Sequence, residues 1–181
     1  MHKSLSALFL AGLTAVSCVS CAADAPAGAL ANANTASPPA APEFTGINNW
    51  INTRPLTMQS LRGKVVLVEF WTYDCINCIR VIPHVKQLHE RYAKDGLVVV
   101  GVHTPEYGHE RILGNVQDAV KRFGITYPVA QDNGYRTWNA YGNQYWPAQY
   151  LIDQTGHVVY SHFGEGQYAQ TEAKIRGLLG K

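Results

Sequence analysis

The chain has 181 residues, of which 46% are hydrophobic and 15% charged, which fits one ordinary domain with a sizeable core. Its 15 lysines and arginines against 13 aspartates and glutamates give a formal net charge of +2, too small for a protein built around nucleic acid. After residue 25 no apolar stretch approaches the roughly 20 residues of a membrane-spanning helix, which excludes an internal transmembrane domain.

Residues 1–23 have the layout of a bacterial export signal. A short start with one lysine is followed by an uncharged apolar stretch over residues 5–16 and then by small residues. That order is typical of a secretory signal with a cleavage zone at its end. Residues 15–18 also loosely resemble a lipobox, in which Cys18 would carry a lipid. We therefore expect an exported, periplasmic protein, either released by cleavage or attached to the membrane only through lipid on Cys18.

Residues 24–43 consist almost entirely of Ala, Pro, Asn, Gly, Ser and Thr and show no apolar periodicity. We interpret them as a disordered spacer and expect one folded domain over residues 44–181. Cys18 and Cys21 could in principle complete a zinc site with the second cysteine pair. Because an export signal is normally removed and such sites need all four ligands together, we expect no metal site.

Apolar runs within residues 44–181 predict strands and helices in alternation. In chain order they are a short strand or hairpin at 47–56, a strand at 64–71, a helix at 76–94, a strand at 97–102, a helix around 116–123, a strand at 128–130, one or two helical turns at 135–141, an antiparallel strand pair at 148–153 and 157–163, and a helix at 171–179. The order predicts an α/β sandwich with helices on both faces of a mixed central sheet.

The second cysteine pair, Cys75-x-x-Cys78, lies where the strand at 64–71 meets the following helix. A helix N-terminus presents unpaired N–H groups and a partial positive charge, which favours a thiolate and lowers the pKa of Cys75. Cys78 follows one helical turn later, on the buried side. We predict that Cys75 attacks, that Cys78 resolves, and that their redox-active disulfide is the only cofactor. A structural disulfide or half a metal site is the alternative.

Three other residues fit thiol chemistry. Glu69 lies inside an apolar strand, where burial would raise its pKa and let it exchange a proton with Cys78, unless it points to solvent. Pro83 is expected to kink the helix, unless the helix is shorter. Pro147 follows an aromatic residue at a strand start, where cis and trans bonds fit equally well. A cis bond there would expose backbone groups that pair with an extended substrate.

The remaining candidates carry weaker signals. Four aromatic residues near these motifs form either a rim that binds a substrate peptide or a cover for the core: Trp71, Tyr73, Tyr145 and Trp146.

Charged and polar residues near the cysteines leave further alternatives. His103, His109 and Glu110 could bind copper or zinc with the cysteines, but we expect a polar loop at the rim of the site. Asp74 would oppose a thiolate on Cys75, and Arg80 would offset Asp74.

Together these residues resemble the thioredoxin superfamily. Glu69-Phe70-Trp71, Cys75-Ile76-Asn77-Cys78 and Pro83 are similar to its buried acid, tryptophan, active-site pair and helix-kinking proline, and Pro147 is similar to its cis-proline. Pro147 lies 72 residues after Cys75, which leaves room for an extra helix and strand. That insertion resembles the TlpA/redoxin branch and implies a thioredoxin-like three-layer sandwich with a helix–strand insertion before the cis-proline.

Four separated motifs resemble more narrowly the thioredoxin-like domain of DipZ-type cytochrome c biogenesis proteins. They lie at 71–73, 101–106, 145–153 and 163–166. The resemblance implies an exported thiol-disulfide oxidoreductase that acts on protein substrates as a reductant and draws electrons from a membrane thiol carrier of the CcdA or DsbD kind. In DipZ-type proteins the membrane part belongs to the same chain, whereas here a signal and a spacer precede the domain. Ile76-Asn77 also departs from the Gly-Pro of thioredoxin, so the redox potential does not carry over.

Two other functions stay open at this point. The first is a thiol peroxidase, because Thr72-x-x-Cys75 resembles part of the peroxiredoxin pattern, although Val68 stands where that pattern has a proline. The second is a copper-delivery protein, for which the spacing of two residues between the cysteines is one residue too short.

Overall fold

The computed structural model describes residues 37–181. The predicted export signal, Cys18 and the predicted spacer up to residue 36 lie outside the described residues. Within residues 37–181, no helix has both the length and the apolar character needed to cross a membrane.

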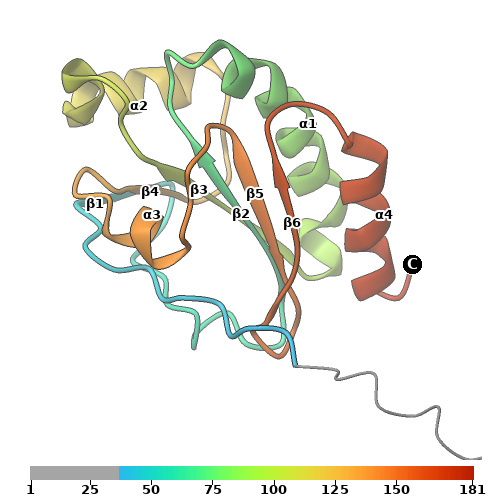
Figure 1. Ribbon diagram of the computed structural model, residues 1–181. Coiled ribbons are helices and arrows are strands. Elements are labelled where there is room, and N and C mark those ends of the chain that lie inside the picture. Colours follow the sequence, from blue (N-terminus) through green and yellow to red (C-terminus); the bar gives the residue numbers. More distant parts are fainter. Residues whose placement is uncertain (1–36) are drawn as a thin grey trace, which may run out of the picture. The chain divides into compact units, whose positions relative to one another are not determined.

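The strands of the described residues form one mixed sheet (Figure 1). They are β1 (Asn49–Ile51), β2 (Val65–Trp71), β3 (Leu97–His103), β4 (Val129–Gln131), β5 (Ala148–Ile152) and β6 (Val158–Phe163). Their order is β1-β4-β3-β2-β5-β6. β2, β3 and β4 run parallel, and β1, β5 and β6 each run antiparallel to a neighbour. Every residue of β2 is buried, which is why its sequence is nearly continuous in apolar residues.

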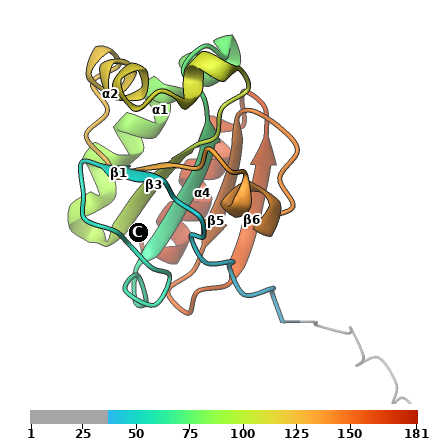
Figure 2. The ribbon, with the colours of Figure 1, turned by 90° about the vertical axis from the view of Figure 1, so that its left-hand side faces the viewer.

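Helices cover both faces of this sheet, as the sequence predicts. On one face α1 (Ile76–Tyr92), α2 (Leu113–Arg122) and α4 (Tyr168–Leu178) bury their apolar sides. On the opposite face the short α3 (Arg136–Ala140) and the segment before β2 form a second core. Figures 1 and 2 show α1 and α4 side by side on the same face. Two single turns of 3-10 helix, Ala93–Asp95 and Gly108–Arg111, complete the elements of the described residues.

The expected insertion is also present. α2 and β4 lie in sequence between β3 and Pro147, and β4 enters the sheet between β1 and β3. α1 continues through Pro83, so the alternative of a shorter helix does not hold. The expected thioredoxin-like arrangement is therefore confirmed.

The packed part of the chain begins before Phe44, where we expected the spacer to end. The N–H of Ala41 donates to the carbonyl of Gly156 at 2.9 Å, and the N–H of Val158 donates to the carbonyl of Pro39 at 2.9 Å. These bonds join residues 39–41 to the turn after β5 and to the first residue of β6. Composition could not reveal them because they use backbone groups, which every residue carries.

Gly101 on β3 allows two aromatic rings to approach the sheet beside Glu69. It pairs in register with Glu69 on β2. A Cβ at this position would lie 2.9 Å from Nε1 of Trp71 and 3.1 Å from Cε2 of Tyr127. The absence of a side chain therefore lets Trp71 and Tyr127 pack against the strand, and it places the Tyr127 ring near the carboxyl of Glu69.

We predict that Gly101→Ala destabilises the protein by about 1–3 kcal/mol, because the added methyl overpacks a buried site. Gly114→Ala is the matched control: a Cβ at Gly114 in α2 meets nothing within 4 Å, so it should leave stability unchanged or raise it by up to about 1 kcal/mol through helix propensity. Urea unfolding followed by circular dichroism measures both. Equal stabilities of the two variants would contradict the close approach at Gly101.

Candidate active site

Cys75 occupies the residue directly before α1. Its backbone is extended, with φ −77° and ψ 112°, and its Sγ accepts a hydrogen bond of 3.2 Å from the N–H of Cys78. Its carbonyl accepts the helical bond from Ile79 at 3.0 Å. The first turn of α1 contains no acidic residue that would compete for these N–H groups. The thiol thus lies at the positive end of the helix, and it is one of its hydrogen-bond acceptors.

The two cysteines differ in exposure and in acidity. Cys75 is half-buried and Cys78 is fully buried, and both are free thiols. Hydrogen bonds from the Cys78 thiol and from the N–H groups of Cys78 and Asn77 outweigh partial burial and lower the pKa of Cys75 to about 7. Burial, followed by the hydrogen bond with Cys75, raises the pKa of Cys78 well above its usual range. One sulfur is therefore suited to attack as a thiolate, while the other keeps its proton.

Glu69 points into the core and not to solvent. Its side chain is completely buried. Oε2 lies 3.5 Å from the hydroxyl of Tyr127, and Oε1 has no hydrogen-bond partner. Burial raises the pKa of Glu69 to about 8, with the Tyr127 hydroxyl lowering it and the charge of Cys75 raising it further. Glu69 also raises the pKa of Cys78 through its charge, so the two groups interact.

Tyr127 is a part of this site that sequence reasoning missed. It follows α2, far from Glu69 in the sequence, and it is fully buried. Only the tertiary packing over Gly101 brings it to Glu69, so no local sequence signal could have identified it.

Pro147 lies at the end of the sheet where β2 leads into the cysteine turn. Ala148 pairs with Phe70 near the end of β2, which places Pro147 next to that end. The Trp146–Pro147 peptide is cis. The carbonyl of Pro147 accepts a 2.8 Å bond from the N–H of Gly164. Trp146 is half-buried, and its Nε1 donates to the carbonyl of Thr104 at 3.0 Å.

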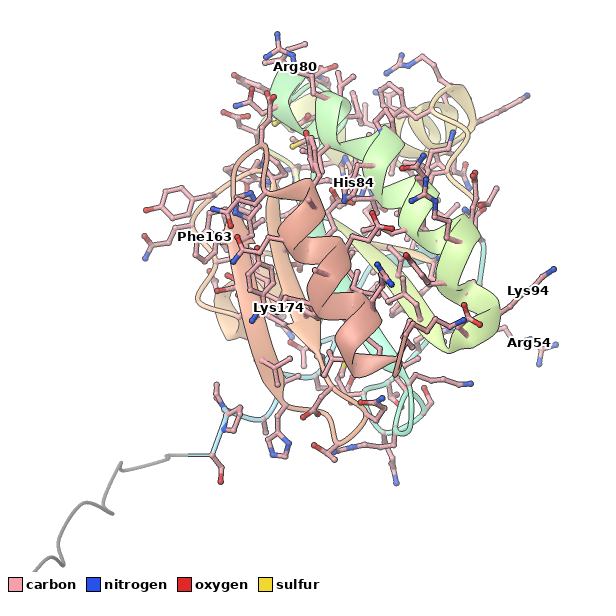
Figure 3. All side chains as sticks on the ribbon, turned by 90° about the vertical axis from the view of Figure 1, so that its right-hand side faces the viewer. Arg54, Arg80, His84, Lys94, Phe163 and Lys174 are labelled. Carbon is pink, nitrogen blue, oxygen red and sulfur yellow. The ribbon has the colours of Figure 1, made fainter. Side chains whose placement is uncertain are left out.

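Trp71 and Tyr73, for which the sequence leaves a substrate rim and a cover for the core as alternatives, lie inside the protein. Trp71 has no exposed surface and Tyr73 only 6%, so both belong to the interior. Trp71 meets the His103 ring edge-on, while Tyr73 stacks on it with ring centres 5.6 Å apart. For these two residues the alternative of a cover for the core holds. Among residues 37–181, the exposed tyrosine and phenylalanine side chains are those of Tyr107, Tyr145 and Phe163. Figure 3 shows Phe163 on the outer strand.

Of the three polar residues that we expected in a loop at the rim of the site, His103, His109 and Glu110, two lie in the interior. His103 and Glu110 are fully buried, and burial lowers the pKa of His103 to about 4. Of these three residues, His109 alone is exposed, and its Nε2 lies 2.5 Å from Oδ2 of Asp74. Arg80, near the start of α1 in Figure 3, pairs with Glu165 at 3.2 Å and not with Asp74. Among residues 37–181, no three His, Cys, Asp or Glu side chains converge on a place for a metal ion.

Comparison with known proteins places this geometry in a family. The model of the AhpC/TSA family matches residues 39–161. Protein DipZ of Mycobacterium tuberculosis is 54% identical over 142 residues, which cover 77% of this chain and 20% of DipZ. The chain thus spans about a fifth of that relative. The thiol-disulfide oxidoreductase YkuV of Bacillus subtilis is 29% identical over 138 residues, covering 76% of this chain and 93% of YkuV.

Solved structures are similar to this chain as well. A thiol:disulfide interchange protein of the thioredoxin family from Chlorobium tepidum is similar with a TM-score of 0.67 and 30% identity, over 80% of this chain and 99% of that one. The sequence match and the arrangement of sheet, helices and cysteine turn support the same assignment. The chain belongs to the AhpC/TSA family and has the thioredoxin fold.

Proposed function

We propose that this protein is a thiol-disulfide oxidoreductase that reduces disulfides of exported proteins through Cys75 and Cys78. The observation that carries the proposal is the asymmetric cysteine pair at the start of α1. The exposed side of that pair holds the sulfur with the pKa of about 7, and the buried side holds the sulfur that retains its proton. The relationship to YkuV, a thiol-disulfide oxidoreductase, supports the same chemistry.

The reaction has two displacement steps. The Cys75 thiolate attacks one sulfur of a substrate disulfide; a bond forms between these sulfurs, the substrate S–S bond breaks, and the departing thiolate takes a proton from water. Cys78 then attacks Sγ of Cys75, which releases the second substrate thiol and leaves a Cys75–Cys78 disulfide. The substrate gains two electrons, and the cysteine pair is oxidised.

Glu69 would act in the second step. Cys78 is a poor nucleophile while it holds its proton, and the buried site offers no solvent to accept that proton. With a pKa of about 8, the fraction of Glu69 that is ionised near neutral pH can accept that proton and return it when the pair is reduced again. The unpartnered Oε1 is free to accept it.

A dedicated electron supply completes the proposal. The sequence of residues 1–23 supports export, with or without lipid on Cys18. Because the bacterial periplasm is kept oxidising, a reductant there needs a donor, and we propose a membrane thiol carrier of the CcdA or DsbD kind. The similarity to DipZ supports this choice of partner.

The site geometry does not support the peroxidase alternative. In the pattern Thr72-x-x-Cys75, the threonine hydroxyl would have to face the reacting sulfur. Here it donates to Oε1 of the Glu110 carboxylate at 2.5 Å. Rapid oxidation of the reduced protein by peroxide in stopped flow would favour the peroxidase instead.

The test of the proposed function is the capture of a mixed disulfide. Cys78→Ala should accumulate Cys75 linked to substrate proteins in the cell envelope, because the resolving thiol is gone. The Cys75→Ala/Cys78→Ala variant is the matched control and should capture nothing. Non-reducing gels and mass spectrometry identify the linked proteins. Capture that persists without Cys75 would show that another group is the nucleophile.

Glu69→Gln should slow the resolving step about tenfold or more near neutral pH, because the proton acceptor is lost while the shape is kept. In the wild type the rate of that step should rise with pH through about pH 8, as Glu69 ionises, and the variant should lack this rise. Quenched-flow separation of mixed and internal disulfides measures the rate. Identical pH profiles would remove Glu69 from the mechanism.

The same variant carries a stability signature. The pKa of Glu69 is raised from 4.5 to about 8 on folding, so its stabilising contribution is fully present below pH 4.5 and is lost as pH rises through 8. Between about pH 4 and pH 7, the wild type should lose about 3 kcal/mol of unfolding free energy relative to Glu69→Gln. Urea titrations across this range provide the check, and parallel curves for both proteins would count against a buried acid.

A further inference from the structure

Glu110 is a buried carboxylate with four hydrogen-bond donors around it. Oε1 accepts from the Thr72 hydroxyl at 2.5 Å and from the N–H of Asp74 at 3.2 Å. Oε2 accepts from the N–H of Glu106 at 2.6 Å and from the N–H of Tyr107 at 2.8 Å. The side chain has no exposed surface. A carboxylate offers two acceptor oxygens and no donor, which matches these four groups, whereas the amide of Asn or Gln has only one acceptor oxygen.

These bonds join two loops that are distant in sequence. One is the turn that leads from β2 to Cys75; the other follows β3 and carries residues 104–110. His103 adds a contact of 3.2 Å between its Nε2 and the Thr72 hydroxyl. The hydroxyl of Tyr73 donates to the carbonyl of His109 at 3.0 Å. Because Asp74 immediately precedes Cys75, the carboxylate holds the backbone one residue away from the attacking sulfur.

We propose that Glu110 is a positioning residue, which fixes the turn before Cys75 so that its sulfur stays directed at the N–H groups that begin α1. The inference rests on the proposed function. Glu110 itself touches no reacting atom. It acts by restricting the backbone at Thr72 and Asp74, and thereby the orientation of the Cys75 side chain toward Cys78.

Loss of the positioning role and loss of the Glu110 charge would shift the pKa of Cys75 in opposite directions. A nearby negative charge disfavours a thiolate, so removal of the Glu110 charge would by itself lower the pKa of Cys75. Loss of positioning would raise that pKa toward the free-thiol value of about 8.5, because the sulfur would lose hydrogen bonds that favour the thiolate. The direction of change therefore separates the two effects.

The variant Glu110→Gln tests this. Glutamine keeps the shape but replaces one oxygen with an NH2 group, which would face two donors and accept from neither. In the reduced full-length protein we expect the alkylation midpoint of Cys75 to rise by about one pH unit and its alkylation rate at pH 7 to fall about fivefold. Iodoacetamide labelling across pH, with mass spectrometry of the Cys75 peptide, gives both values. An unchanged or lowered midpoint would overturn the proposal.

Glu106→Gln is the matched control in the same loop. Its side chain is exposed, its charge raises the pKa of Cys75, and its backbone N–H still reaches Glu110. The same loss of one negative charge should therefore lower the alkylation midpoint or leave it unchanged. A rise equal to that of Glu110→Gln would show that the effect is not positioning.

A second pair of variants covers the case in which Glu110→Gln does not fold. Thr72→Val removes one donor to Glu110 and keeps the shape, so it should raise the midpoint by a smaller amount, whereas Thr72→Ser keeps the hydroxyl and should restore it. Equal midpoints for Thr72→Val and Thr72→Ser would contradict the proposal. A wild-type midpoint near 8.5 would instead overturn the proposed thiol activation and this inference together.

Discussion

The hydrogen bond from the N–H of Cys78 to Sγ of Cys75 is the contact on which the proposed chemistry depends. It exists only because β2 ends one short turn before α1 begins, so that the first N–H groups of the helix have no carbonyl partners and are free to bind a thiolate. The sheet supplies the rigid end of that turn, since β2 is buried along its whole length between β3 and β5. Fold and reactivity are thus linked through one helix terminus.

Differences in burial separate Cys78 and Glu69 from Cys75. Cys78 and Glu69 share the apolar interior, which disfavours charge on both, whereas Cys75 lies at its border. A proton passed between Glu69 and Cys78 moves within one poorly solvated region, and neither group needs to reach water. The same burial explains why an acid is tolerated in the middle of an apolar strand: near neutral pH it is mostly uncharged.

Sequence reasoning recovered the features that depend on local pattern. The strands and helices follow from apolar periodicity, and the cysteine turn follows from the junction of a buried strand with an amphipathic helix. It could not decide between a rim and a cover for the core for Trp71, whose ring lies inside the core, because an aromatic residue near an active site fits both places equally well in a linear sequence. Sequence reasoning did not predict the role of Tyr127 or the hydrogen bonds of Glu110, for another reason. They join segments dozens of residues apart, and nothing in either segment specifies its partner.

The bonds of residues 39–41 to the turn after β5 and to the start of β6 fix where this segment lies on the domain. β5 begins beside the cysteine turn, with Ala148 opposite Phe70, and ends at the other extreme of the sheet, with Ile152 opposite Val66. The chain therefore enters the domain at the pole remote from Cys75, as the lower end of Figure 1 shows. The contacts of residues 39–41 and the cysteine turn thus occupy opposite ends of the same sheet.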